Sequence, residues 1–202
     1  MSQKEKAREG ASLEECLQGI DFLDLWNEKI FLGQEFLTWL WLLSEREGHE
    51  ISLPNGESVE IFFEKKLELT LGQGGNKRKI SITTPEETRD PDWDEAYIAV
   101  GNHKKISKGS LRVKYREREW RLSLPHDTLA PQGLKIAAQP KDPAESDDLS
   151  LIGKFMDNVA LTAELLNNLE SLLALFLARR LSTEWETEDL PLLESWLSSR
   201  KA

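Results

Sequence analysis

The longest stretch without a helix breaker sets the strongest limit on how this chain can fold. From Leu149 to Leu181 there is no proline, and Gly153 is the only glycine. This composition predicts one helix, which would be about 50 Å long at 1.5 Å per residue if it is continuous. A compact domain of this size does not need so long a helix, so we expect part of it to project from the body.

The apolar residues of this predicted helix occupy two seams rather than one. The first seam contains Ile152, Met156, Val159, Ala163 and Leu166, and the second contains Leu161, Leu165, Leu169, Leu172 and Phe176. A single sheet would not cover both seams, so we expect a second helix against one of them. That helix is either Leu190–Leu197 folding back or a helix of a second subunit. The predicted association residues are Met156, Val159, Leu165, Leu169, Leu172 and Phe176.

Upstream of this helix, some segments space their apolar residues as a helix does and others alternate them as a strand does. A broad apolar band predicts a largely buried helix from Gln34 to Glu47. From Ser58 to Leu71 apolar and polar residues alternate, which predicts one long strand or two strands broken near Glu64 and Lys65. The segment GQGGN then predicts a hairpin connection, and KRKISITT predicts the returning strand.

The most regular part of the chain is a second predicted hairpin. Apolar and basic residues alternate from Leu111 to Arg116, and alternation returns from Glu119 to Leu124 after the turn RERE. One face of this hairpin should therefore be apolar and the other basic. A short helix is predicted before it, from Asp92 to Val100, and a short extended piece after it, near Leu134 to Ala138.

These elements predict an α+β fold in which antiparallel hairpins form a sheet packed on helices, with a long C-terminal helix. Residues 1–12 are expected to be a disordered tail. An apolar pattern of helical spacing runs from Leu13 to Leu25 and opens an α+β domain over residues 13–143, which holds the basic hairpin. Residues 144–202 form the long helix and a C-terminal helix, which together are the expected association element.

The charge of the chain is unevenly distributed. The formal net charge of -10 argues against nucleic acid at first sight, because an acidic surface repels phosphates. Residues 101–121, however, contain 8 basic and 2 acidic side chains, a net +6. Such a basic strand face is either a solvated hairpin surface or a phosphate-binding surface. The candidate DNA-binding residues are Lys104, Lys105, Lys108, Arg112, Lys114, Arg116 and Arg121.

Motifs typical of enzymes and metal sites are missing from the sequence. GQGGN lacks the GK[ST] ending of a phosphate-binding loop and lies between predicted strands. His49, His103 and His126 are isolated, and Cys16 is the single cysteine, so no paired ligand spacing exists. We therefore expect a protein that binds a partner and is not an enzyme, with no metal and no cofactor. A catalytic site assembled from scattered carboxylates remains an alternative.

The distribution of apolar residues also bears on location. We find no run approaching the roughly 20 apolar residues that a membrane span requires, and the first ten residues, MSQKEKAREG, are charged. The expectation is a soluble, cytoplasmic protein without a membrane partner, located at the nucleoid if it binds DNA.

Two stretches, FLGQEFLTWLW and GNHKKISKGSLRVKYREREWRLSLPHDTLAPQGLKI, resemble the recombination-associated protein RdgC family. In that family a helix ends in a Gly-Lys type turn, a strand leads into a hairpin with an aromatic and a basic turn, and an Asp and a Leu-Lys step follow. The matching elements are Gly101 with Lys104 and Lys105, the strands around Leu111 to Tyr115 and Trp120 to Leu124, then Asp127, Leu129, Leu134 and Lys135. The likeness is one of pattern and covers about a quarter of the chain.

The resemblance implies a non-enzymatic protein that forms a ring-shaped dimer around double-stranded DNA, binds with little sequence preference and restrains RecA-dependent recombination. The chain would then be a shortened relative that corresponds to the C-terminal portion. The N-terminal half of the family is missing and both ends are acidic, so closure of a ring is not implied. The expected partners are double-stranded DNA and either a second copy or a separately encoded chain. The alternative is a protein-interaction subunit without nucleic-acid contact.

Overall fold

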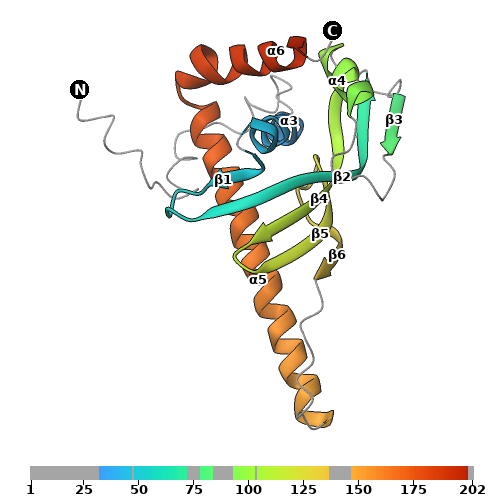
Figure 1. Ribbon diagram of the computed structural model, residues 1–202, viewed down its shortest axis with the longest axis vertical. Helices are drawn as coiled ribbons and strands as arrows, with labels where there is room; N and C mark the ends of the chain where they lie inside the picture. Colours follow the sequence, from blue (N-terminus) through green and yellow to red (C-terminus); the bar gives the residue numbers. More distant parts are fainter. Residues whose placement is uncertain are drawn as a thin grey trace, which may run out of the picture.

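The computed structural model describes residues 32–46, 48–71, 78–83, 93–102, 104–136 and 147–199 of the 202-residue chain. It contains one antiparallel sheet with helices packed against it, and one long helix whose first half extends away from the body (Figure 1). The predicted α+β class with a long C-terminal helix is confirmed. The predicted tail over residues 1–12, the apolar pattern of Leu13 to Leu25, Cys16, the GQGGN connection and His103 lie outside the described residues.

The sheet has six strands, and every pairing in it is antiparallel. The strands follow the order β1-β2-β4-β5-β6, and β3 pairs with the second half of β2. Their bounds are β1 Glu50–Ser52, β2 Ser58–Leu71, β3 Arg78–Thr83, β4 Lys105–Tyr115, β5 Arg118–Pro125 and β6 Gln132–Ile136.

Strand β2 reconciles the two predictions made for its segment. It is one continuous strand from Ser58 to Leu71, but its pairing with β4 shifts register between Phe63 and Leu67. Lys65, inside this irregularity, has a φ of 61°, in the left-handed region that an extended strand does not use. The local irregularity bends the strand, and helix α3 lies within that bend (Figure 1).

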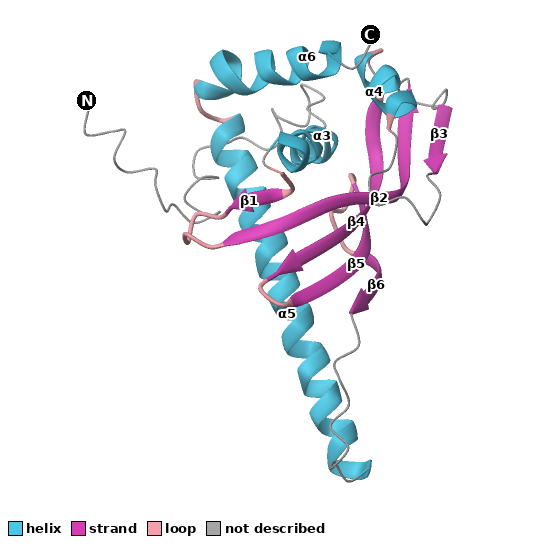
Figure 2. Ribbon diagram, in the orientation of Figure 1, coloured by secondary structure: helices cyan, strands magenta, loops and turns pink. Residues whose placement is uncertain are grey.

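The helices agree closely with the predicted segments. Helix α3 begins two residues before the predicted Gln34 and ends one residue before Glu47. The short helix predicted before the basic hairpin is α4, and the long helix is α5, followed by a π-helical turn, η2, and α6 (Figure 2). Their bounds are α3 Leu32–Arg46, α4 Asp94–Gly101, α5 Asp147–Arg180, η2 Trp185–Asp189 and α6 Leu190–Ser199.

The core joins the sheet to α3 and to the second half of α5. The rings of Phe36 and Trp39 in α3 each lie 5.5 Å from the ring of Phe176 in α5. Trp120 of β5 is fully buried in the same cluster. Large aromatic side chains contribute most to such a core because each removes a large apolar area from water. The second half of α5 is therefore an integral part of the folded body.

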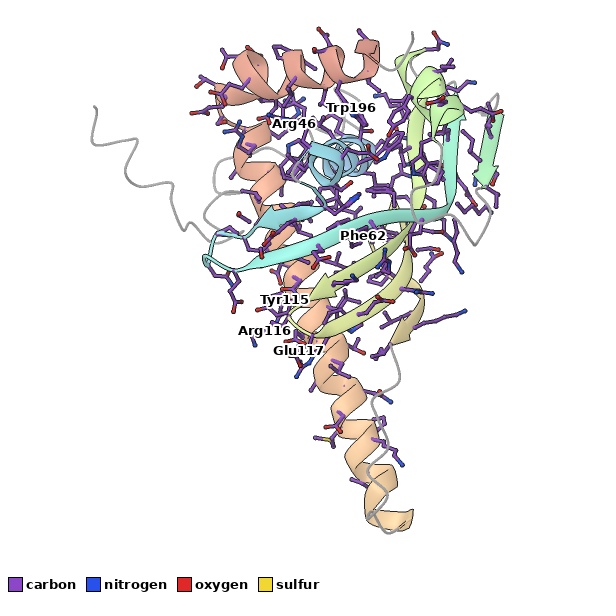
Figure 3. All side chains as sticks on the ribbon, viewed as in Figure 1. Arg46, Phe62, Tyr115, Arg116, Glu117 and Trp196 are labelled. Atoms are coloured by element: carbon purple, nitrogen blue, oxygen red, sulfur yellow. The ribbon has the colours of Figure 1, made fainter. Side chains whose placement is uncertain are left out.

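Helix α6 packs on α3 and α4 rather than on the first half of α5. The ring of Trp196 lies 5.0 Å from that of Trp41 and 5.3 Å from that of Tyr97 (Figure 3). The segment Leu190–Leu197 was one of the two candidates to pack against an apolar seam of α5. It packs instead on α3 and α4. In the first seam of α5, Ile152 and Met156 remain 67% and 59% exposed.

One described helix segment is long and apolar enough to cross a membrane, which corrects the expectation that no segment approaches that length. It is Ile152–Arg180 of α5, with a mean hydropathy of 1.3 over its most apolar 18 residues. Length and composition alone are weak support for a span, because the core helix of a soluble protein can meet the same criteria. Here Leu172 and Phe176 are fully buried in the protein core.

Candidate phosphate-binding surface

The basic side chains of the hairpin lie on the face of the sheet opposite the core. Val113 and Trp120 point into the core and are fully buried. Their neighbours Arg112, Lys114 and Arg121 point the other way, with side chains 18%, 35% and 51% exposed. This alternation follows from the two-residue period of a strand and is the one expected from the sequence. We call the surface that carries these cations the outer sheet face.

The pairing register places three cations beside one another across the outer sheet face. Arg112 of β4 is the register partner of Arg121 of β5, and Arg121 is in turn the register partner of Lys135 of β6. We call Arg112, Arg121 and Lys135 the basic row. Like charges directly opposite each other on neighbouring strands destabilise a sheet. The arrangement therefore requires compensation from within the chain or from a bound anion.

Carboxylates supply part of that compensation. Glu119 of β5 contacts both arginines of the row, with Oε2 3.6 Å from Nη1 of Arg112 and Oε1 3.1 Å from Nη2 of Arg121. Glu64 of β2 also accepts a hydrogen bond from Nε of Arg112. Lys135 is exposed at the end of the row. Among the residues that the structure describes, carboxylates therefore compensate the row most heavily at Arg112 and least at the β6 edge.

An aromatic side chain extends the row on its β2 side. Phe62 is the register partner of Arg112, and the guanidinium of Arg112 lies 4.0 Å from the centre of its ring. The ammonium of Lys114 lies 5.2 Å from the centre of the same ring, and the imidazole ring of His49 lies 4.4 Å from it. Figure 3 labels Phe62. Cation–π contacts of this kind hold the charged groups flat against the sheet.

The other predicted basic residues divide between the outer sheet face and other parts of the hairpin. Lys108 lies further along β4 and donates a hydrogen bond to Gln132, while Lys114 pairs with Glu60 at 3.6 Å. Lys105 is the first residue of β4 and Lys104 precedes it, so both lie at the opposite end of the strand from the hairpin turn that holds Arg116. The structure therefore gathers Lys108, Arg112, Lys114 and Arg121 on the outer sheet face and separates the remaining three from them.

Arg116 belongs to a separate cluster at the hairpin turn. Glu57, in the loop between β1 and β2, accepts hydrogen bonds from the hydroxyl of Tyr115 and from the guanidinium of Arg116. The Tyr115 hydroxyl and, after it, the Arg116 guanidinium lower the pKa of the Glu57 carboxyl. The same hydrogen bond raises the pKa of Tyr115. This cluster fastens the hairpin turn to the β1–β2 loop.

Lys135 and Glu119 were not among the site residues expected from the sequence. Lys135 appeared only as a match in the family pattern, and nothing in the sequence specifies which residue of β6 pairs with Arg121. Glu119 lies two residues before Arg121, which places both side chains on the same face of a strand. That spacing could have indicated the pair, but not the second contact with Arg112 on the neighbouring strand.

The predicted association residues of α5 fall into two groups. Leu165, Leu172 and Phe176 are fully buried in the core of the chain itself, and Leu169 is 8% exposed. Met156 and Val159 are 59% and 48% exposed on the projecting half. Only these two of the six predicted residues therefore present their side chains to a partner.

The described residues do not bring together a metal-binding group of three or more His, Cys, Asp or Glu side chains. Of the histidines they include, His49 has its ring tilted by 32° against that of Phe62, and His126 has its Nδ1 atom 3.0 Å from the carbonyl oxygen of Ser107. The outer sheet face is consequently best described as a surface of fixed charges. Such a surface can bind an anion by charge and hydrogen bonding.

Comparison of the chain with protein-family models, with curated proteins and with solved structures gives no match. The resemblance to the RdgC family accordingly depends on the sequence pattern alone and stays a prediction.

Proposed function

We propose that this chain is a non-catalytic protein that binds double-stranded DNA through its phosphates, with the outer sheet face as the contact surface. The observation that carries the proposal is the basic row, in which Arg112, Arg121 and Lys135 lie side by side on three strands. The three side chains of the row are positively charged hydrogen-bond donors, and a phosphate is a negatively charged group with acceptor oxygens. Contacts to phosphates carry no sequence information, so binding should show little sequence preference.

The resemblance to the RdgC family supports the same proposal from a different direction, since Lys135 and the hairpin strands lie within the matching pattern. It adds the expectation that the protein acts at the nucleoid and in recombination. The acidic remainder of the chain restricts the contact, because a chain with a formal net charge of -10 repels DNA outside its basic surface. Binding should therefore be local and strongly dependent on salt.

The test is the affinity of the chain for a labelled duplex of about 25 base pairs, measured by fluorescence anisotropy over a salt series. We expect affinity to fall steeply as salt rises. Lys135→Gln should weaken binding and reduce the slope of log affinity against log salt by about 0.9, the value for one phosphate contact. Lys79→Gln, which removes an exposed lysine from β3, is the matched control and should change neither quantity.

The proposal fails if the wild-type chain does not bind the duplex at about 50 mM salt, with any candidate partner chain present. It also fails if Lys79→Gln and Lys135→Gln weaken binding equally, because the effect would then reflect net charge rather than the basic row.

A second candidate function is that of a protein-interaction subunit without nucleic-acid contact. The observation that favours it is the exposed apolar seam on the first half of α5, where Ile152, Phe155 and Met156 are all more than half exposed. Exposed apolar patches of this kind mark interaction surfaces. Recovery of one stoichiometric protein partner after nuclease treatment, together with no DNA binding, would favour this function over the first.

A further inference from the structure

The projecting half of α5, together with the turn that follows it, presents an apolar seam on the side that faces away from the body. At 100° per residue, Ile152, Met156, Val159, Ala163 and Leu166 lie within about 80° of one another around the helix. The core-facing residues Leu161, Leu165 and Leu172 lie on roughly the opposite side of the same helix. We call the first group, with Phe155 on its flank, the outer seam. All of its residues except Ala163 have large apolar side chains, and these side chains are 46–67% exposed.

We propose that the outer seam pairs with the outer seam of a second copy of this chain, and that the two α5 helices run antiparallel with a two-fold axis at Val159. This association does not depend on DNA binding. A seam that is complementary to itself is the requirement for a two-fold symmetric contact. The sizes of the side chains meet this requirement in one direction only.

In the antiparallel arrangement, Ile152 of one copy lies opposite Leu166 of the other, and Phe155 lies opposite Ala163. A large ring therefore faces a small side chain at each end of the contact, and the centre is formed by Val159 against itself. Alternation of large and small side chains across a helix pair allows close packing. In a parallel pair, Phe155 would face Phe155 and Ala163 would face Ala163, which leaves crowding at one level and a gap at another.

The charge of the chain favours the same direction. Each copy carries a formal charge of -10, and the folded body lies at the C-terminal end of α5. A parallel pair would bring both acidic bodies to the same end, whereas an antiparallel pair places them at opposite ends. The helix dipoles are also favourably aligned when the helices are antiparallel.

The area available is enough for a dimer of moderate affinity. Five half-exposed large side chains per copy correspond to about 1,000 Å² buried in total, near the lower limit for a specific interface. We therefore expect association on the order of micromolar concentrations rather than an obligate dimer. The dimer should form reversibly as protein concentration changes.

Sedimentation velocity between about 1 and 100 µM tests the association. The wild-type chain should shift from the monomer mass to twice that mass across this range. Val159→Glu, at the centre of the seam, should remain monomeric at the highest concentration. Asn158→Glu adds the same charge one residue away, at an exposed position outside the seam, and should associate like the wild type. A wild-type chain that stays monomeric throughout, or a Val159→Glu variant that still dimerises, overturns the proposal.

Disulfide formation tests the direction of the helices, in a Cys16→Ser background that removes the native thiol. A mixture of Ile152→Cys and Leu166→Cys chains should form a mixed disulfide under oxidation, while Ile152→Cys alone should not crosslink. In the antiparallel pair the two copies of residue 152 are about 21 Å apart, which a disulfide cannot bridge. Self-crosslinking of Ile152→Cys would show parallel helices and overturn the antiparallel arrangement.

A membrane surface is the other chemistry that could cover an apolar helix face. Flotation of the chain with anionic phospholipid vesicles distinguishes it from a second copy. If the wild type floats with the vesicles, Val159→Glu does not, and no dimer forms in solution, the seam is a lipid-binding face and the dimer proposal is wrong. Dimerisation without flotation supports the proposal.

Discussion

Gly33 lies where the first turn of α3 meets the loop after β5. A Cβ atom at this position would be 1.8 Å from the backbone oxygen of His126 and 2.8 Å from its carbonyl carbon. Backbone atoms cannot rotate away as the end of a flexible side chain can, so a methyl group would push α3 off the sheet. The absence of a side chain at Gly33 is thus what allows the helix to approach its sheet so closely.

We expect Gly33→Ala to lower the free energy of unfolding by about 3 kcal/mol, the upper range for overpacking. Gly153→Ala is the matched control, because a Cβ atom there meets nothing within 4 Å and Gly153 lies in the interior of α5. That substitution should raise stability by up to about 1 kcal/mol through helix propensity. Urea unfolding followed by circular dichroism measures both, and equal effects of the two substitutions would contradict the account of Gly33.

Glu119 competes with a bound phosphate if the outer sheet face is a DNA surface. Glu119→Gln removes the carboxylate that contacts both Arg112 and Arg121, so duplex affinity should rise. We expect an increase on the order of threefold, because an exposed ion pair is worth less than about 1 kcal/mol. The control is Glu164→Gln, whose carboxylate pairs with Arg118 outside the basic row. Anisotropy titrations at one fixed salt concentration compare the two, and a loss of affinity in Glu119→Gln would exclude the competition.

At the scale of elements, the contact between the β1–β2 loop and the β4–β5 turn predicts a pH dependence. The folded state lowers the pKa of Glu57 from its ordinary 4.5, so the stabilisation is present above pH 4.5 and is lost as pH falls through the lowered value. The folded state raises the pKa of Tyr115 from 10.0, so this contribution is present below pH 10 and is lost as pH rises through the raised value.

Glu57→Gln should accordingly flatten the fall in urea unfolding midpoint that occurs as pH decreases below 4.5. Glu95→Gln, on the exposed side of α4, should leave the acid limb of the profile unchanged. Urea midpoints measured at half-unit pH intervals test this. An acid limb that is identical in the wild type and in Glu57→Gln would show that Glu57 does not contribute to it.

Individual elements were predictable where one side-chain period runs without interruption. The apolar band of helical spacing predicted α3 to within two residues at either end. The strict alternation from Leu111 to Arg116 predicted the second half of β4 and its two faces, but not the first half from Lys105 to Ser110. What the sequence does not contain is the register between strands. The basic row depends on β6 pairing so that Lys135 meets Arg121, and its compensation depends on Glu64 of β2, far away in the chain. Charge counting therefore located the basic strands but not the glutamates that neutralise much of their charge.

At the scale of the whole molecule, α5 has two different roles along its length. Its second half is part of the core, where Leu165, Leu172 and Phe176 are fully buried. Its first half projects beyond the body, and residues 152–160 are all exposed. The period of the apolar residues showed both seams, but it could not show which one the chain covers by itself. The seam that remains uncovered is available for intermolecular contact.

Hydrogen exchange should resolve these two halves within one helix. Amides around Leu165 to Phe176 should exchange only through global unfolding, because opening them disrupts the core. Amides from Ile152 to Ala160 should exchange much faster in dilute solution, because local fraying of a projecting helix exposes no buried surface.

If the outer seam pairs with a second copy, the fast group should gain protection as protein concentration rises from about 1 to 100 µM, while the slow group stays constant. Mass spectrometry of peptides from both halves measures this, and Val159→Glu should abolish the concentration dependence without changing the protection of the second half. Uniform protection along α5 at low concentration would show that the first half is stabilised within the monomer.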